Sequence, residues 1–239
     1  MLIPPQRDVP ERLDLHHGSL LEVRRSLHDI RRINTFLGGT RLSIHGILPL
    51  LRDVNDRAIL LDVGCGLGDV GAALINAAAR EGKVLRVVGL DINARHLGLA
   101  RREYPQVLGV RGDAFRLPLG DLSVDIVHSS LFLHHFRARE VEGLLREFSR
   151  VARVGWFMND LARHTLPLWF FRSTWPIFAR SPLTRFDGSA SVRRAYTRRE
   201  LSRVAGVVPG ARVRAHFPFR LSIAWRRSAL PALASKVED

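Results

Sequence analysis

The spacing of hydrophobic residues changes along the chain from a helical period to an alternation of short strands and helices. From Arg12 to about Leu51, apolar residues recur at steps of three and four, which is typical of amphipathic helices. From Ala58 onward, short apolar runs typical of buried strands alternate with helical segments. We expect strands at 58–63, 84–91, 107–112, 123–128 and 154–158. Helices are expected from the glycine-rich turn after the first strand to about residue 80, over 94–103 and over 137–151.

This alternation predicts an α/β fold with a doubly wound, mostly parallel, seven-stranded Rossmann-like sheet and an N-terminal helical cap. A further helix is expected from Thr197 to Ala205, where Thr197 and Glu200 have the spacing of a capping box. The runs 212–217 and 219–225 lie too close together for a crossover helix. They should therefore pair antiparallel at the C-terminal edge of the sheet.

We interpret all 239 residues as a single domain. Its expected parts are a helical cap (1–55), a cofactor-binding core (56–160), an insertion (161–195), a C-terminal helix and strand pair (196–227) and a tail (228–239). The insertion is rich in aromatic residues and prolines between His164 and Phe186. It could form a lid over a substrate pocket, a peripheral membrane contact, or a helix packed on the cap. The lid is favoured, because connections at the carboxyl ends of parallel strands border ligand sites.

Composition excludes several classes of protein. The chain is 46% hydrophobic and 25% charged, which is ordinary for a globular domain. It has no apolar run of about 18 residues, and prolines and charges interrupt its first eight residues, so we expect no membrane span, no signal peptide and a cytoplasmic location. The single cysteine, Cys65, excludes an internal disulfide and a multi-cysteine metal site.

The charge balance is strongly basic. The 37 basic and 23 acidic residues give a formal net charge of +14, which could concentrate RNA, an anionic membrane or acidic substrates. The arginines are spread over the whole chain, so a compositional bias is the stronger interpretation. RNA stays open as a partner, DNA is not expected, and the pattern carries no signal for an oligomeric state.

A glycine-rich turn follows the first core strand. Gly64, Gly66 and Gly68 would let the backbone turn tightly and approach a nucleotide-like ligand. The stretch 66–71 also fits the G-x-G-x-x-G pattern of dinucleotide sites, with Asp91 placed 20 residues beyond its last glycine. A lone match of that kind leaves more than one ligand open.

Carboxylates near this turn favour a cationic ligand. Asp62 lies two residues before the first glycine, where it would repel a diphosphate and attract an ammonium or sulfonium group. Asp113 ends the third strand and could accept from an exocyclic amine, while the N–H of Ala114 could donate to a ring nitrogen. This pair predicts recognition of adenine.

Over roughly residues 58–158 these features together resemble class I S-adenosylmethionine-dependent methyltransferases. The resemblance implies that Asp62 lies near the methionine moiety and that Asp91 takes both ribose hydroxyls. It implies S-adenosyl-L-methionine as cofactor, bound by Asp62, Gly64, Gly66, Gly68, Asp91, Ile92, Asp113, Ala114 and Ser129.

The acceptor site should follow the fourth and fifth strands. A sulfonium already activates the methyl group, so the protein mainly has to align the acceptor. A phenol, with an ordinary pKa of about 10, would benefit from a base, and His134 and His135 are the catalytic candidates, with structural packing as the alternative. Substrate contacts are expected from Arg31, Asn34, Asn159, Arg163, His164, Trp169 and Phe170.

Missing signatures narrow the acceptor. Methyltransferases that act on exocyclic amino groups of bases have an Asn/Asp-Pro-Pro-Tyr/Phe motif after the fourth strand, and residues 129–132 of this chain lack it. Methylation of cytosine C5 needs a nucleophilic cysteine, but the only cysteine of this chain lies in the glycine turn. Asn159-Asp160 reverses the Asp-Asn pair of the metal-dependent catechol type, so no metal is expected. A small hydrophobic or aromatic acceptor is left.

Stretches in the cap, after the fifth strand and in 187–201 also resemble bacterial methyltransferases of quinone and polyketide pathways. This resemblance implies a phenolic or polyketide-like acceptor, with oxygen methylation favoured over carbon methylation. Three alternatives stay open: an RNA-modifying methyltransferase, an NAD-dependent oxidoreductase, and a cofactor-binding subunit without an acceptor pocket.

Overall fold

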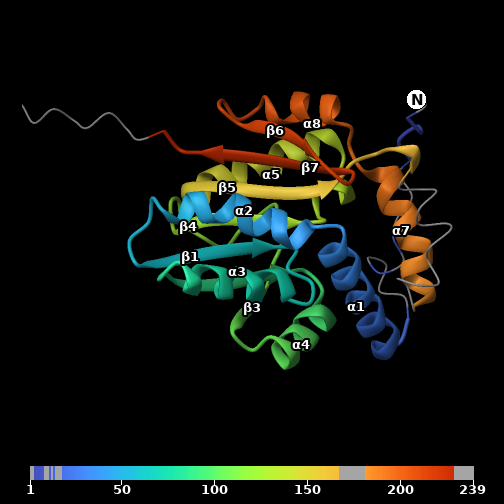
Figure 1. The fold of residues 1–239 in the computed structure, drawn as a ribbon, viewed down its shortest axis with the longest axis horizontal. Coiled ribbons are helices and arrows are strands. Elements are labelled where there is room, and N and C mark those ends of the chain that lie inside the picture. The colour runs from blue at the N-terminus through green and yellow to red at the C-terminus, as the bar shows by residue number, and fades with distance from the viewer. Residues whose placement is uncertain (1–2, 8–10, 12, 14–17, 167–180, 229–239) are drawn as a thin grey trace, which may run out of the picture.

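A seven-stranded sheet forms the centre of the protein (Figure 1). The computed structural model describes residues 3–7, 11, 13, 18–166 and 181–228. The strands are β1 (Arg57–Val63), β2 (Val84–Asp91), β3 (Val107–Arg111), β4 (Val124–Ser130), β5 (Ala152–Leu161), β6 (Arg212–His216) and β7 (Arg220–Arg226). Their order is β3-β2-β1-β4-β5-β7-β6, and β1 to β5 run parallel. The predicted mostly parallel sheet is confirmed.

The C-terminal strand pair lies at one edge of the sheet, as expected. β7 pairs antiparallel with both β5 and β6. The reversed strand is therefore β7, one position in from the edge, while β6 forms the edge itself and runs in the direction of β1 to β5. Pairing on both sides of β5 also lengthens that strand beyond the predicted end at Met158, so that Asn159 and Asp160 lie inside it.

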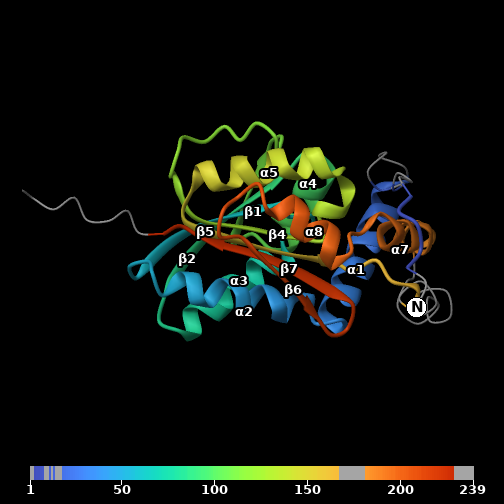
Figure 2. The same ribbon diagram turned by 90° about the horizontal axis from the view of Figure 1, so that it is seen from above.

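Helices cover both faces of the sheet (Figure 2). α2 (Gly39–Leu51) and α3 (Asp69–Arg80) pack on one face, α5 (Ala138–Val151) and α8 (Arg198–Ala205) lie on the other, and α4 (Ala94–Glu103) packs against β2 and β3. α1 (Leu20–Phe36) and α7 (Pro182–Arg194) stand beyond the carboxyl ends of the parallel strands (Figure 1). Among the described helices, none is long and apolar enough to cross a bilayer.

The sequence explains why α5 and α8 form on the face of the sheet opposite α2 and α3. α5 buries Val141, Leu144 and Phe148 on one stripe against the sheet. The predicted capping box of α8 is present, because the Thr197 hydroxyl accepts from the Glu200 N–H and the Glu200 carboxylate accepts from the Thr197 N–H at 2.8 Å.

The predicted N-terminal cap divides into two parts. α1 stands over the strand ends, but α2 belongs to the helical layer on the sheet. Gly46 allows this, because a Cβ there would lie 2.3 Å from the ring of Phe157 on β5. An amphipathic helix could lie over the strand ends or against the face of the sheet, so the pattern of α2 does not decide between these two positions. The close approach that Gly46 allows places α2 on the sheet.

The C-terminal part of the insertion is a helix, α7, which packs on α1. α7 begins at Ser181, whose side chain accepts from the Leu183 N–H and whose own N–H donates to Asp29 of α1 at 2.8 Å. The three alternatives concern 164–186 and stay open, because most of that segment lies outside the described residues. Residues 167–180, with Trp169 and Phe170, and residues 229–239 of the expected tail lie outside the described residues.

Adding a methyl group at Gly46 should separate α2 from the sheet. Gly46→Ala is expected to lower the free energy of unfolding by about 1–3 kcal/mol, because the Phe157 ring must move. Gly143 of α5 is the matched control: its Cβ would meet nothing within 4 Å, so Gly143→Ala should stabilise by about 0.5–1 kcal/mol. Urea unfolding measures both, and shifts of the same sign would contradict the packing of α2.

Candidate functional site

A cavity of about 450 Å³ opens at the carboxyl end of the sheet, beside α1. Its volume lies in the range of small-molecule sites. The residues of its wall that the sequence predicted as cofactor contacts are Asp62, Gly64, Gly66, Asp91, Ile92, Asp113 and Ala114. Arg31 and Asn34 of α1 and the histidines His134 and His135 line the same cavity. Residues assigned to cofactor and to acceptor thus share one space.

The glycine turn takes a conformation that side chains would obstruct. Gly64, Gly66 and Gly68 all have positive φ values. A Cβ on Gly64 would lie 2.4 Å from the ring of Phe132, and the Gly64 N–H donates to the Leu90 carbonyl of β2 at 2.8 Å. The turn therefore brings its backbone to the cavity wall, with Gly68 behind the wall as the residue that begins α3.

Asp91 is an ionised carboxylate held in place by donors. One oxygen accepts from the Asn93 N–H at 2.8 Å and the other from the Gly66 N–H at 3.0 Å. Burial by itself would raise the pKa of Asp91, but these bonds and the His96 ring outweigh it and lower the pKa. The carboxylate keeps lone pairs free for the two hydroxyls of a ribose.

Carboxylates dominate the charge of the cavity wall. Glu11, Asp62, Asp69, Asp91 and Asp113 line it, and Arg31 is the one arginine among the described wall residues. Burial, reinforced by the charge of Asp62, raises the pKa of Asp69 to about 6 against the effect of a backbone hydrogen bond. This wall attracts a ligand with positive charge and repels a diphosphate.

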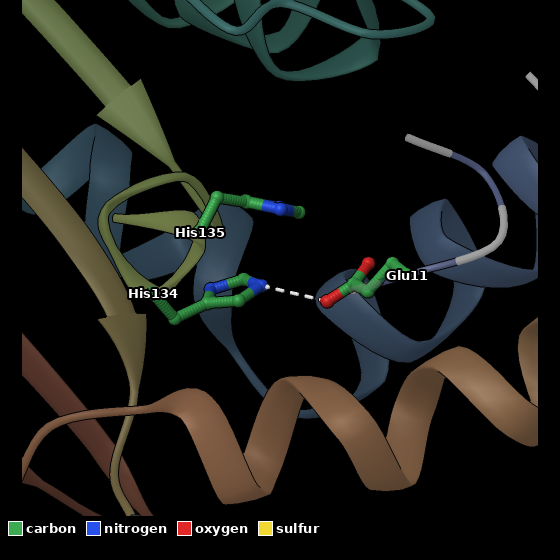
Figure 3. Close-up of side chains that lie close together, drawn as sticks. All are labelled: Glu11, His134 and His135. Carbon is green, nitrogen blue, oxygen red and sulfur yellow. Dashed lines mark hydrogen bonds and ion pairs between the residues drawn. The ribbon is translucent and has the colours of Figure 1, made fainter. Parts of the chain in front are cut away.

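A second polar cluster lies at the histidine end of the cavity (Figure 3). His134 Nδ1 lies 2.7 Å from Asp160 Oδ1, and its Nε2 faces Glu11 Oε1 at 3.3 Å. The Ser191 hydroxyl donates to the same Glu11 oxygen at 2.5 Å. The His135 ring lies beside that of His134, with ring centroids 4.3 Å apart. The His134 ring is thus placed between two carboxylates.

This placement makes His134 a cation at neutral pH. Burial alone would lower the pKa of His134, but the charges and hydrogen bonds of Asp160 and Glu11 raise it to about 10. Burial alone would raise the pKa of Glu11, but His135, His134 and Ser191 lower it to about 2. The sequence left a histidine base and structural packing open here, and the raised pKa of His134 favours a protonated ring over a free base.

The donor atoms of Glu11, His134 and His135 all lie within 4.8 Å of one another. Imidazole nitrogens and a carboxylate are ligands that Zn²⁺ and similar ions accept. Both ring nitrogens of His134 face carboxylate oxygens, however, and two ring protons satisfy that arrangement. A metal ion would have to replace the Nε2 proton, so the geometry is that of a cluster that holds a proton.

Comparison with known proteins gives a family match for part of the chain. Residues 61–158, which run from β1 to β5, match the family described as "Methyltransferase domain". The match covers less than half of the chain, which is therefore similar to a methyltransferase domain over that stretch. The carboxylates of the cavity wall agree with a cofactor that carries positive charge.

Relatives and solved structures support this assignment. The chain is 32% identical over 129 residues to an uncharacterized methyltransferase of Synechocystis, covering 54% of each chain. It is 32% identical over 108 residues to a demethylmenaquinone methyltransferase of Bacillus licheniformis, covering 44% of each. Magnesium protoporphyrin IX methyltransferase of Synechocystis, solved with bound S-adenosylmethionine, has the same fold, with a TM-score of 0.56 and 15% identity over 93% of this chain and 100% of that one. The chain spans about half or less of the length of the first sequence relatives.

Besides Gly68, four of the predicted site residues that the structure describes do not line the cavity. Asn159 lies inside β5 and bonds to other strands and to α2, while Arg163 donates to the Ala195 carbonyl and pairs with Glu200. The His164 ring packs on another ring, and Ser129 points away from the wall that its neighbour Ser130 joins. Asn159 was expected in a loop after the fifth strand, but β5 extends past it and turns its side chain away from the cavity.

Arg31 and Asn34 line the cavity at different places. The Arg31 guanidinium lies 5.7 Å from the centre of the Tyr104 ring and acts on the pKa of Asp69, so it belongs to the glycine-turn end rather than the acceptor end. The Asn34 amide lies 3.5 Å from the Ser130 hydroxyl, near the end of β4.

The sequence did not predict two residues of the polar cluster around His134, namely Glu11 and Ser191. Glu11 carries no local signal, since it lies in an irregular N-terminal segment that meets α7 only in the fold. Ser191 falls in the stretch 187–191 that resembles bacterial quinone and polyketide enzymes, and that resemblance was its only sequence signal.

The ion pair of His134 should make stability depend on pH. With a folded pKa of about 10 against 6.5, its contribution is complete below pH 6.5 and is lost as the pH rises to about 10. With a folded pKa of about 2 against 4.5, the contribution of Glu11 is complete above pH 4.5 and is lost as the pH falls. The stability difference between wild type and His134→Gln should therefore be largest between pH 4.5 and 6.5.

Urea unfolding of both proteins at pH 5.5, 7.5 and 9.5 measures this difference. His45→Gln is the control, because that ring is exposed on α2 and bonds only to a carbonyl of its own helix. A difference for His134→Gln that is the same at all three pH values would contradict the ion pair.

Proposed function

We propose that the protein transfers a methyl group from S-adenosylmethionine to a phenolic oxygen of a small hydrophobic acceptor. The observation that carries the proposal is the continuity of the cavity. One space joins the carboxylates around the glycine turn to the His134 cluster, and Phe132, Phe136 and Leu161 supply apolar wall between them. A cationic cofactor and an apolar ring with a titratable oxygen match the two ends.

Relatives support an acceptor that contains a ring. Besides the demethylmenaquinone enzyme, a 2-phytyl-1,4-naphtoquinone methyltransferase of Thermosynechococcus is 42% identical over 64 residues, covering 26% of this chain and 27% of that one. Both names describe quinone-type molecules. We infer that this chain takes an apolar ring compound of related character, with the oxygen rather than a ring carbon as the nucleophile.

The residues of the cavity wall fit the cofactor by charge. Asp91 would hold the ribose hydroxyls, Asp113 with Ala114 the adenine, and Asp62 the ammonium group of the methionine moiety. Bound there, the cofactor supplies a methyl group that its sulfonium already activates. What the protein adds is alignment of the acceptor and exclusion of water.

The imidazolium of His134 would stabilise the deprotonated form of the acceptor. A phenol with an ordinary pKa of about 10 is a weak nucleophile at neutral pH, and its phenolate is a strong one. A cationic Nε2–H donor lowers the pKa of the bound phenol, so the phenolic proton leaves to solvent and the phenolate stays paired with His134. The phenolate oxygen takes the place at Nε2 that Glu11 Oε1 occupies at 3.3 Å. Methylation then removes the negative charge and with it the ion pair.

This role predicts a loss of turnover without a loss of cofactor binding. His134→Gln should lower kcat by about 10²-fold or more, because the phenolate loses its charged donor, while the Kd of S-adenosylhomocysteine stays within about twofold. The wild-type rate should rise with pH as the phenolate forms and fall above pH 10, where His134 loses its proton. Steady-state assays with a resorcinol, a catechol and a naphthol measure this, with His45→Gln as control.

The product decides between the remaining functions. A methyl ether found by mass spectrometry and NMR supports the proposal, whereas a methyl group on a ring carbon overturns oxygen methylation. Methylation of RNA but of no phenol would favour the RNA-modifying alternative. Binding of S-adenosylhomocysteine without transfer to any phenol or RNA would favour a cofactor-binding subunit.

A further inference from the structure

A continuous chain of buried hydrogen bonds runs from Asp62 across the sheet to β7. Asp62 Oδ1 lies 2.7 Å from His128 Nδ1 on β4, and His128 Nε2 lies 2.8 Å from Ser43 Oγ on α2. Asn159 Nδ2 of β5 donates to Ser43 Oγ at 2.7 Å, and Arg220 Nη1 of β7 donates to Asn159 Oδ1 at 2.8 Å. All five side chains are buried, and only Asp62 lines the cavity.

The direction of every bond in this chain follows from its arginine end. A guanidinium can only donate, so the atom of Asn159 that faces Arg220 is the amide oxygen, and the amide nitrogen donates to Ser43. Ser43 then has its own proton to give to His128 Nε2. His128 therefore carries its proton on Nδ1 and donates it to the Asp62 carboxylate.

The chain joins a buried cation to a buried anion. Burial lowers the pKa of Arg220 to about 10, so its side chain, 1% exposed, stays charged at neutral pH. Among the described residues, no carboxylate forms an ion pair with Arg220. Aligned bonds in a medium of low dielectric constant polarise one another, so the positive end strengthens the donor that reaches Asp62.

The protein leaves space for this arrangement at the start of α2. A Cβ on Gly39 would lie 2.5 Å from Arg220 Nη1 and 2.0 Å from Asn34 Oδ1. Only glycine at this position admits the guanidinium between α2 and the sheet. A core of apolar side chains would need neither the glycine nor the five polar groups.

We propose that His128, Ser43, Asn159 and Arg220 are positioning residues that fix Asp62 Oδ1 and leave its second oxygen for the α-ammonium group of S-adenosylmethionine. This inference rests on the proposed cofactor role of Asp62. Ser43 of α2 and Arg220 of β7 do not line the cavity. They contribute to cofactor affinity through the hydrogen-bond chain that ends at Asp62. The ligand group concerned is a primary ammonium ion on an amino-acid tail.

Two ligands that differ in this tail separate positioning from general stability. S-adenosylhomocysteine carries the ammonium group, and 5′-methylthioadenosine has the same nucleoside and sulfur without the amino-acid tail. Ser43→Ala should weaken S-adenosylhomocysteine by about 10-fold and His128→Leu by about 100-fold in calorimetric Kd, because a bond to a charged group is lost or misplaced. Both variants should bind 5′-methylthioadenosine within about twofold of wild type.

Matched variants control for burial and shape. Ser26→Ala makes the same change at a fully buried serine of α1 that bonds to Thr184 instead, and it should bind both ligands like wild type. His128→Asn keeps an N–H near the position of Nδ1 and should recover most of the affinity that His128→Leu loses. In the unmodified protein, long-range ¹H–¹⁵N correlation spectra should show His128 with its proton on Nδ1.

Three results would overturn the inference. Ser43→Ala and His128→Leu could bind S-adenosylhomocysteine as tightly as wild type, or they could lose both ligands equally, which would show a structural role only. A proton on Nε2 of His128 would contradict the direction of the chain. A wild-type protein that binds neither ligand would overturn the proposed function itself, and with it the role given to Asp62.

Discussion

The arrangement of the whole site depends on holding several carboxylates close together at one end of a parallel sheet. β1, β2 and β3 end within one cavity, and each brings an acid to it: Asp62, Asp91 and Asp113. Like charges in a poorly solvated space repel, so each carboxylate needs donors to stay ionised. Gly66 and its turn supply one such donor to Asp91, and His128 supplies one to Asp62. The glycine turn is thus part of the charge balance as well as a space for ligand.

The carboxylates at the His134 end of the cavity also need compensating charge, but there the protein supplies the cation. There the carboxylates of Glu11 and Asp160 are compensated by a proton held on His134, and the cation belongs to the protein. At the glycine turn, under the proposed function, the compensating cation belongs to the cofactor. One cavity therefore separates a region that attracts positive charge from a region that can pair with a developing anion. Under the proposed function, this separation suits the transfer of a methyl group from a sulfonium to a phenolate.

Local pattern was sufficient where an element is defined by its own residues. β2 and α4 begin and end where the sequence predicted, because turn and cap residues flank a clear apolar period. The end of β5 could not be predicted in this way, since Asp160 and Leu161 pair only with β7, about 60 residues later. Glu11 and Arg220 were missed for the same reason: nothing beside them in the sequence records that they become buried against partners far along the chain.

The order of Asn159 and Asp160 shows how one strand serves both ends of the site. Successive side chains of a strand point to opposite faces, and β7 pairs with β5 across both residues. Asn159 therefore turns toward α2 and joins the chain that ends at Asp62, while Asp160 turns toward the turn after β4 and accepts from His134. Exchanging the two would place a carboxylate against Arg220 and an amide against His134. Both the donor chain to Asp62 and the ion pair of His134 would then be lost, so the register of β5 against β7 fixes the polar contacts at the two ends of the cavity together.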